Sequence, residues 1–459
     1  MSVFSLSNLK KTWYYLQKNG IRNAVWAVLE RIGQEQEVYT WQEPDEKTLS
    51  FQREHSASLR ISIVVPAYRT KKEHLEAMLN SVSRQSYPHW ELIVADAGGT
   101  AESVQAWAKK NGICLREAAD ASNLAEWKDQ SIMLCTLSEN KGISANTNAG
   151  IELAAGDAVG LLDHDDLLTA NALWEMADCL EKEKKRGKQK LVLFSDEDKC
   201  DGAASRFYEP NFKPDFDGEL LLTNNYICHF AVIETAFLKE LKLRSGFDGA
   251  QDYDLMLRAY AAGGQFVHVP KVLYHWRCHE ASTASNPQSK RYAYEAGQRA
   301  LEDYCLRKGW KATVSGLKHL GFYREDYEDS VFCQRPEIGI WAKPLPGGRD
   351  VFGIRHPKGF LVSGLYENDG SMRYAGLRKG YSGPMHRAAL QQSAPAADLR
   401  SMEVCSALKE RYAQTIAELK EACQGLPTAA QEKKILQKSM EFCKEATAAG
   451  YGILWDPQA

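Results

Sequence analysis

The chain has 459 residues, 44% hydrophobic and 25% charged, a composition typical of a globular protein of two or three domains. The formal net charge of −3 gives no overall attraction to nucleic acid or to an anionic membrane. Eleven scattered cysteines without a CxxC pair favour reduced thiols over a disulfide framework or a zinc site. The sequence shows no signal peptide and no stretch of 18 apolar residues, so we expect a cytoplasmic protein without a transmembrane helix.

Residues 1–58 are predicted to form an N-terminal extension that begins with a short helical part. In residues 1–33, five basic side chains stand against one acid, Glu30, a net charge of +4. Tryptophans at positions 13 and 26 add aromatic surface. Such a helix either lies on a membrane, here the inner face of the cell membrane, or packs on its own domain. Gly20 would split it into two short helices, which favours packing.

An apolar, β-branched run predicts a first buried strand at 61–65, ended by Pro66. Helical spacing follows at Leu75, Met78, Leu79 and Val82. The stretch "WELIVADAGGT" predicts a second strand that breaks into a glycine-containing loop after Asp96, and a helix then runs through Trp107. Residues 34–60 are predicted to be a charged loop, and 112–131 a surface insertion.

Two more strands are predicted at 132–137 and 158–162, joined by a helix whose N-cap is Ser144 or Asn146. Four alternations of strand and helix predict an α/β fold with a doubly wound, mostly parallel sheet. Ligands bind such sheets at the carboxyl ends of the strands. Residues 66–68, Asp96 and the acidic cluster 163–166 all follow strand ends, so we expect them at one edge.

The acidic cluster in "LLDHDDLL" allows two interpretations. Two like charges 4 Å apart repel by about 4 kcal/mol at an effective dielectric near 20, and by about 1 kcal/mol in water. A solvated turn tolerates that repulsion, whereas the mouth of a pocket requires a cation. The first strand is followed by neither GxxxxGK[ST] nor GxGxxG. A phosphate-bearing ligand would therefore take its positive charge from a divalent cation held by carboxylates.

Several stretches between residues 59 and 307 resemble the family 2 glycosyltransferases, which have the GT-A fold. They are "ISIVVPAY", "WELIVADAGGT", "NKGISANTNAGIELAAGDAVGLLDHDDLL", "FSDEDK", "FKPDFDGELLLTNNYICHF", "GFDGAQDYDLMLRA" and "VPKVLYHWRCHEASTAS". The likeness is closest to bacterial members that build cell-surface polysaccharides such as rhamnose-containing chains and O-antigens. Two positions depart from the family: Arg69 replaces the usual Asn, and "AGGTAES" replaces a serine-threonine-aspartate run.

The resemblance implies a role for each matching residue of the reaction centre. Asp163 and Asp165 match the D-x-D that holds Mn²⁺ or Mg²⁺ on the donor diphosphate. His275 matches a histidine that joins the metal in some members, and Asp252 matches the catalytic base. From the residues alone, His275 is equally a core histidine, and Asp252 is alternatively an acid favoured by a helix N-terminus.

The resemblance also implies a nucleotide site. Asp96 matches the acid that contacts the N3–H of a uracil-type base, and Asn146 matches a polar group near the nucleotide. Residues Pro66, Ala67 and Tyr68 match the lining of the base pocket. Asp96 is alternatively an ordinary turn residue. Asp196 and Asp198 either contact the sugar or the acceptor or form a solvated turn.

These roles predict an inverting, metal-dependent glycosyltransferase. One carboxylate takes the proton of the acceptor hydroxyl, while a cation stabilises the departing diphosphate. The expected partners are a UDP- or dTDP-sugar and a glycan or lipid-linked glycan acceptor, with no nucleic acid. A non-catalytic glycan- or nucleotide-sugar-binding partner subunit is the main alternative, and a metal-dependent nucleotidyltransferase is another. Both D-x-D and Asp252 in one domain argue against a non-catalytic role.

The catalytic domain is predicted at 59–320, followed by a truncated, degenerate second α/β region at 335–459. "SMEFCKEATAAGYGILWDP" from Ser439 echoes "DYDLMLRAYAAGGQFVHVP" from Asp252, 187 positions earlier. Asp252 corresponds to Ser439, so the echo lacks the base. Chance similarity is the alternative, because a helix leading into a strand through "AAG" is a common pattern.

Overall fold

The structure is a computed structural model that describes residues 39–118, 128–278, 291–316, 321–328, 330–342, 364–365, 402–422, 438–439, 441–443, 445–446 and 448–455. The predicted helix in residues 1–33 lies outside the described residues. The chain divides into two compact units. The sheet unit comprises 36–216 and 226–301, and the C-terminal unit comprises 217–225 and 302–459 together with 1–35.

The sheet unit is built on ten strands. They are β1 (Ile61–Ala67), β2 (Trp90–Asp96), β3 (Cys114–Ala118), β4 (Ser131–Thr136), β5 (Ala158–Leu161), β6 (Leu167–Leu168), β7 (Leu191–Asp201), β8 (Phe207–Asn211), β9 (Ala231–Glu234) and β10 (Gln265–Cys278). The order is β3-β4-β2-β1-β5-β9-β7-β10-β6, with β8 beside β7. The first five strands and the pair β7–β10 are parallel, whereas β9 runs antiparallel to β5 and β7. This confirms the predicted mostly parallel α/β sheet.

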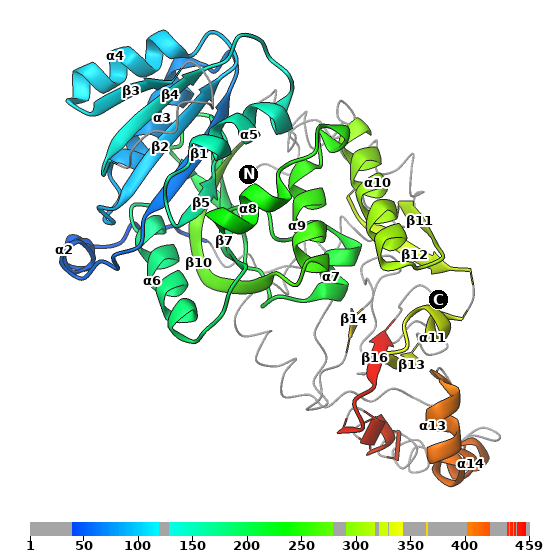
Figure 1. The fold of residues 1–459 in the computed structure, drawn as a ribbon. Helices are drawn as coiled ribbons and strands as arrows, with labels where there is room; N and C mark the ends of the chain where they lie inside the picture. The colour runs from blue at the N-terminus through cyan, green and yellow to red at the C-terminus, as the bar shows by residue number, and fades with distance from the viewer. Residues whose placement is uncertain are drawn as a thin grey trace, which may run out of the picture. The chain divides into compact units, whose positions relative to one another are not determined.

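Helices cover both faces of this sheet (Figure 1). Those that contact its strands are α3 (Lys72–Ser83), α4 (Ala101–Asn111), α5 (Ile143–Leu153), α6 (Ala172–Lys185) and α8 (Thr235–Leu241). The unit also holds α2 (Glu46–Glu54), α9 (Gln251–Ala261) and the first part of α10 (Arg291–Lys308). Helices α3, α4 and α6 pack in one core with alternate residues of β1, such as Ile63. The intervening residue Val64 faces Gly150 of α5. Because strand side chains alternate between faces, an uninterrupted apolar run suits a sheet covered on both sides.

The predicted end of the first strand at Pro66 is wrong, because β1 continues to Ala67 and pairs with β2 throughout. The N–H of Ile61 faces His89, next to β2, so by alternation Pro66 faces the β5 side. The pairing with β5 ends earlier, at Val64 and Leu161. Pro66 therefore leaves no ladder hydrogen bond unmade, and the strand tolerates it.

Two predicted loops contain regular structure. Helix α2 lies in the supposed charged loop, where the side chain of Asp45 accepts the N–H of Thr48 at 2.7 Å and caps its first turn. Strand β3 lies in the supposed insertion, at the edge of the sheet, and most of its side chains are half-buried. Both segments bury few residues, so they lack the apolar periodicity that identifies the inner elements.

The predicted N-cap of α5 is also wrong. Gly142 is the N-cap, with φ +94°, and Ser144 and Asn146 lie inside the first turns of the helix. A Cβ at Gly142 would meet the Asp248 carboxylate, which accepts the N–H of Ser144 at 3.3 Å. A carboxylate supplied by another segment caps this helix, which local sequence does not reveal.

The C-terminal unit holds α7 (Gly218–Thr223), β11 (Ala312–Gly316), β12 (Tyr323–Tyr327), α11 (Val331–Gln334), α13 (Ser406–Arg411) and α14 (Ala413–Ala422). Its four-stranded sheet is formed by β13 (Ile338–Ala342), β14 (Gly364–Leu365), β15 (Met402–Val404) and β16 (Gly452–Trp455). The parallel pair β13–β16 lies at its centre. The division into 1–58, 59–320 and 335–459, with a degenerate copy at the end, stays a prediction.

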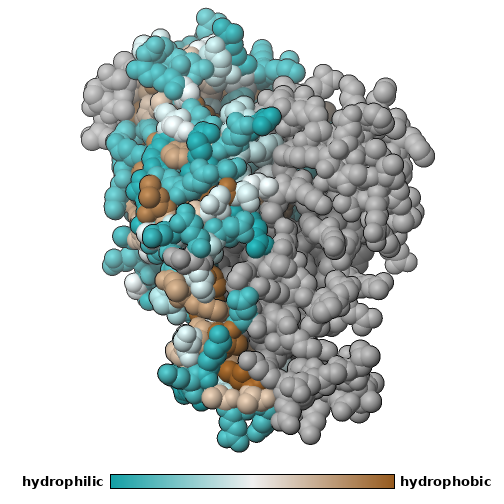
Figure 2. Space-filling view, turned by 90° about the vertical axis from the view of Figure 1, so that its right-hand side faces the viewer, coloured by the Kyte–Doolittle hydropathy of each residue, from teal (hydrophilic) through white to brown (hydrophobic). Residues whose placement is uncertain are grey.

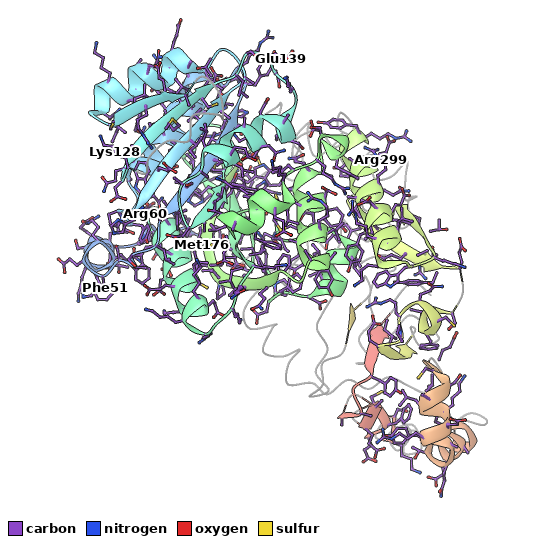
Figure 3. The ribbon with its side chains drawn as sticks, in the orientation of Figure 1. Phe51, Arg60, Lys128, Glu139, Met176 and Arg299 are labelled. Atoms are coloured by element: carbon purple, nitrogen blue, oxygen red, sulfur yellow. The ribbon has the colours of Figure 1, made fainter. Side chains whose placement is uncertain are left out.

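On the face that Figure 2 shows, the described surface is mostly hydrophilic. Large exposed hydrophobic side chains among the described residues are Phe51, Tyr68, Tyr292 and Leu306. Figure 3 places Phe51 on α2 and Arg299 on α10. No helix in the described part of the chain combines the length and the apolar character needed to span a membrane.

Candidate functional site

The acidic loop between β5 and β6 is fixed by one of its own carboxylates. Asp166 is buried and accepts the hydroxyl of Tyr274 at 2.5 Å and the backbone N–H of Arg277 at 2.7 Å. Burial, with the charges of Asp165 and Asp163, raises the pKa of Asp166 well above its usual range. Asp163 and Asp165 remain half-buried. The loop therefore has one internal anchor and two carboxylates that solvent or a ligand can reach.

Arg277 of β10 holds the backbone of the same loop. Its side chain is almost entirely buried, with Nε donating to the carbonyl of Asp165 at 2.5 Å and Nη1 to the carbonyl of Gly202 at 2.7 Å. A buried guanidinium therefore ties the acidic loop to the backbone that follows β7. The sequence analysis missed this arginine, although it stands in the motif "YHWR" next to His275.

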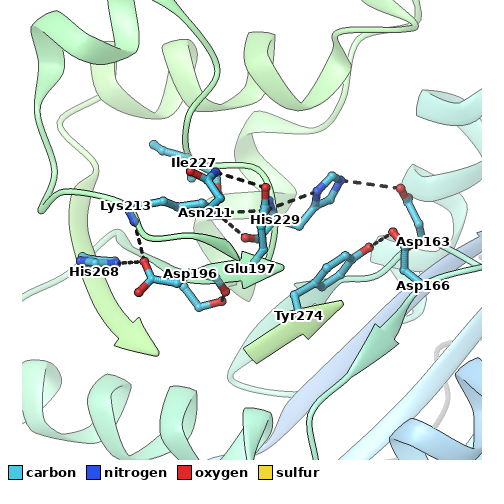
Figure 4. Close-up of polar contacts among 11 residues, drawn as sticks. Asp163, Asp166, Asp196, Glu197, Asn211, Lys213, Ile227, His229, His268 and Tyr274 are labelled. Atoms are coloured by element: carbon cyan, nitrogen blue, oxygen red, sulfur yellow. Dashed lines mark hydrogen bonds and ion pairs between the residues drawn. The ribbon is translucent and has the colours of Figure 1, made fainter. Parts of the chain in front are cut away.

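His229 is the histidine that lies beside the acidic loop. Its Nε2 is 3.8 Å from Oδ2 of Asp163, and its Nδ1 is 3.7 Å from Oε2 of Glu197. Its ring stacks on Tyr274, with ring centroids 4.9 Å apart (Figure 4). Burial alone would lower the pKa of His229, but Glu197 and then Asp163 raise it to about 9. An imidazolium therefore faces the carboxylate predicted to hold a metal.

Asp252 approaches this group from the first turn of α9. It accepts a hydrogen bond from the thiol of Cys228, and burial together with Asp252 raises the pKa of that thiol well above its usual range. Partial removal of water raises the pKa of Asp163, His229 opposes this rise, and Asp165 and Asp252 add to it. The predicted base and the predicted D-x-D therefore lie close enough to interact electrostatically. Their convergence from separate segments is the central feature of the site.

The predicted nucleotide residues lie at the ends of β1 and β2. Asp96 is buried, and its carboxylate accepts the backbone N–H groups of Gly98, Thr100 and Ala101 at 3.0, 3.2 and 2.8 Å. These contacts shape the turn and cap α4, which is the role of an ordinary turn residue. Contact with a base stays a prediction.

The neighbouring Tyr68 is 40% exposed, and its ring lies beside Gly98. The guanidinium of Arg69 lies 5.0 Å from the Tyr68 ring centroid. The residue that departs from the family pattern therefore covers the predicted base-pocket tyrosine. Pro66 and Ala67 lie in register with Ala95 and Asp96, so these parts of the predicted pocket are brought together.

Asn146 is buried at the start of α5. Its Oδ1 accepts the N–H of Lys141 at 3.3 Å, and its Nδ2 donates to Asn140 at 2.8 Å. Both contacts hold the loop that enters the helix. Its predicted place near a nucleotide stays a prediction.

His275 is not brought together with Asp163. Its Nδ1 lies 2.5 Å from Oδ1 of Asp198, and its ring contacts Trp41 and Phe207. Because successive strand residues point to opposite faces, His275 faces away from the side where Tyr274 meets the acidic loop. The structure gives His275 the position of a core histidine. No group of three or more His, Cys, Asp or Glu side chains suited to a metal occurs among the described residues.

Asp196 and Asp198 do not form the solvated turn that one interpretation predicted. Both are buried in β7, where they lie in register with Val272 and His275 of β10. Asp196 accepts the backbone N–H of Lys213 at 2.7 Å and contacts Nε2 of His268 at 2.8 Å. Asp198 accepts the hydroxyl of Tyr39 at 2.7 Å. Both carboxylates therefore have internal partners.

One family model matches the part of the chain that holds the acidic loop. Residues 62–241 match the sequence model described as "Glycosyl transferase family 2". The matched residues make up less than half of the chain. The matched span includes β1 to α8, and therefore the acidic loop and His229.

Three curated relatives are similar to this chain. The protein y4gI of Sinorhizobium fredii is 36% identical over 55% of this chain and 26% of its own length. The O-antigen biosynthesis protein RfbC of Myxococcus xanthus is 34% identical over 56% of this chain and 19% of its own length. The amylovoran biosynthesis glycosyltransferase AmsB of Erwinia amylovora is 28% identical over 47% of this chain and 70% of its own length. This chain thus spans about a quarter or less of the length of the first two relatives.

Proposed function

We propose that this chain is an inverting, metal-dependent glycosyltransferase that moves a sugar from a UDP- or dTDP-sugar to a growing cell-surface glycan. The observation that carries the proposal is the convergence of Asp252 with the loop of Asp163 and Asp165, a loop that lies in the part of the chain matching the family 2 model. The name of the relative RfbC, an O-antigen biosynthesis protein, supports a polysaccharide as product. We further propose that the acceptor is a glycan or a lipid-linked glycan.

On the leaving-group side, Asp163 and Asp165 fit a divalent cation that completes its shell with phosphate oxygens and water. Mg²⁺ and Mn²⁺ are commonly bound by one or two carboxylates plus substrate phosphates. Both side chains are half-buried, and loss of water, with smaller contributions from Asp165 and Asp252, raises the pKa of Asp163. When bound, the cation would supply positive charge to the departing diphosphate. Asp166 and Arg277 keep the two carboxylates in place.

On the acceptor side, Asp252 is the base. Its carboxylate lies in the first turn of α9 and can accept a proton from a hydroxyl group. That proton leaves the acceptor oxygen as the oxygen bonds to the anomeric carbon, and the bond to the diphosphate breaks. Cys228 contacts Asp252 and restricts its orientation. Attack opposite the leaving group inverts the anomeric centre.

A donor screen tests the proposal. The purified chain is incubated with UDP- and dTDP-sugars, with Mn²⁺, with Mg²⁺ or with a chelator, and nucleotide release is measured with and without a glycan acceptor. We expect release from one donor class, loss of release with chelator, and no response to the chelator in a control with protein omitted. Turnover that the chelator leaves unchanged would contradict the metal-dependent mechanism. Absence of turnover with every donor would contradict the proposed function.

A further inference from the structure

Lys213 is a fully buried lysine directly beneath the site. It follows β8, and its Nζ donates to Oε2 of Glu197 at 3.2 Å, to the carbonyl of Ile227 at 3.1 Å and to the carbonyl of His229 (Figure 4). A lysine ammonium has three N–H donors, so these three acceptors use all of them. Burying an ammonium is costly unless it is paired and fully hydrogen-bonded. This arrangement satisfies both conditions.

Two of the three contacts clamp a short segment on both sides of one residue. Ile227 and His229 flank Cys228, whose thiol contacts Asp252. His229 itself reaches Asp163 through its ring. One ammonium therefore holds the backbone on both sides of Cys228. It thereby helps to place Cys228, which contacts the proposed base, and His229, which contacts Asp163.

Glu197 ties the same segment from a second direction. Its Oε2 accepts the backbone N–H of His229 and lies 3.7 Å from the His229 ring. Burial alone would raise the pKa of Glu197, but Lys213 and then His229 lower it to about 2. Asp196 accepts the backbone N–H of Lys213 at 2.7 Å, which fixes the lysine in turn. Two adjacent acids of β7 thus anchor the clamp to the central sheet.

We propose that Lys213 is a positioning residue for glycosyl transfer: it clamps residues 227–229 and thereby sets the placement of Asp252 relative to Asp163. The role in glycosyl transfer rests on the proposed function, whereas the clamp itself is a property of the fold. Nothing in the sequence "FKPDF" marks this lysine as more than a charged residue beside a proline.

Lys213→Met tests the clamp directly, because methionine fills similar volume and donates no hydrogen bond. Hydrogen exchange of the backbone at 226–230 and the alkylation rate of Cys228 are measured by mass spectrometry. We expect both to rise by about 10-fold or more, since both hydrogen bonds from Lys213 to the segment are lost. Lys239→Met is the matched control, because Lys239 also donates to two carbonyls, of Glu152 and Ala154, in the same unit. It should leave 226–230 and Cys228 unchanged.

Removing Lys213 alone leaves Glu197 buried without its ammonium partner, which threatens folding. The double variant Lys213→Met/Glu197→Gln removes both charges and keeps the test available if the single variant does not fold. Unchanged exchange at 226–230 and unchanged Cys228 alkylation in the folded variant would overturn the clamp, whatever the activity.

The role in transfer is measured on the same variants. With the donor found in the screen, we expect kcat for transfer to fall about 10- to 100-fold, a smaller change in the donor KM, and a higher ratio of donor hydrolysis to transfer. A merely structural role would lower the active fraction and leave this ratio unchanged. A loosened segment with unchanged kcat and unchanged ratio would overturn the positioning role. A wild-type chain inactive with every donor would overturn the proposed function and the role in transfer, while exchange still decides the clamp.

Discussion

Two histidine–carboxylate pairs of the sheet unit occupy different environments. His275 and Asp198 are both buried, and Tyr39, Trp41 and Phe207 enclose them. His229 is 22% exposed and spans from buried Glu197 to the half-exposed Asp163. A pair whose groups all have internal partners stabilises the fold, whereas a pair that ends on an accessible carboxylate can act on a ligand. The difference assigns stability to the first pair and chemistry to the second.

Replacing the carboxylate of each pair by an amide should separate the role in chemistry from the role in stability most strongly. Asp163→Asn should lower donor turnover by about 100-fold or more, because it removes one of two carboxylates proposed to hold the cation. Its free energy of unfolding should change little, since the side chain is half-exposed. Steady-state kinetics and urea denaturation measure the two effects.

Asp198→Asn is the counterpart in the other pair. It should reduce the free energy of unfolding by about 1–3 kcal/mol, because His275 and Tyr39 lose a buried charged acceptor. Donor turnover per folded molecule should stay within a few-fold of wild type. If Asp198→Asn abolished turnover and Asp163→Asn did not, the assignment of the pairs would be reversed.

The histidines themselves sharpen the comparison. His229→Gln should lower turnover by about 10-fold or more and change its metal response, because the ring contacts Asp163. His275→Gln should mainly destabilise the fold, by about 1–3 kcal/mol, since Asp198 loses a buried partner. Titrating Mn²⁺ in activity assays distinguishes them. A shifted metal response in His275→Gln alone would support the family's histidine ligand over the position seen in the structure.

The pH dependence of stability gives a third contrast. The folded state raises the pKa of His229 to about 9, so this group's stabilisation is complete below its unfolded pKa, near 6.5, and is lost as pH rises toward 9. The pKa of Glu197 is lowered to about 2, so its stabilisation is present above about pH 4.5 and is lost as pH falls toward 2. Urea denaturation between pH 6 and 10 should show a decline in wild type that His229→Gln reduces. Equal slopes would contradict the raised pKa.

The smallest expected effect is that of Tyr39→Phe. It removes one hydrogen bond to Asp198 and keeps the ring that packs near Phe212, so the loss of stability should be about 1 kcal/mol. Thermal denaturation measures it, and activity should be unchanged. A loss of activity without a loss of stability would place this pair in the chemistry.

The sequence predicted those parts of the fold whose signal is local. The inner strands β1, β2, β4 and β5 and the helix α3 show dense apolar runs or regular spacing, because both faces of the sheet are covered. Edge strand β3 and helix α2 bury little and gave no such signal. The end of β1 was predicted wrongly at Pro66. A strand accepts this proline only where β5 has stopped pairing with β1, which depends on tertiary structure and not on local sequence.

The sequence likewise predicted the site residues that stand in motifs and missed those that act through distant partners. The acids Asp163, Asp165 and Asp252 stand in motifs, and the structure brings the predicted base and the acidic loop together. His229 and Lys213 act through partners distant in sequence, so no spacing rule connects them. For His229 the available signal is its place in the largely apolar stretch "NYICHFAV", because a buried charge needs a buried partner, whereas the sequence around Lys213 carries no such signal.

The central claim is that Asp252 acts as the base opposite the D-x-D loop, and Asp252→Asn tests it most directly. Asp254→Asn is the matched control, because Asp254 is buried against Arg244 and Arg258 and serves the fold. With the active donor and a glycan acceptor, Asp252→Asn should lower transfer by about 10²- to 10⁴-fold while unfolding like wild type. Asp254→Asn should lose stability but keep turnover per folded molecule. Equal transfer by wild type and Asp252→Asn would contradict the account.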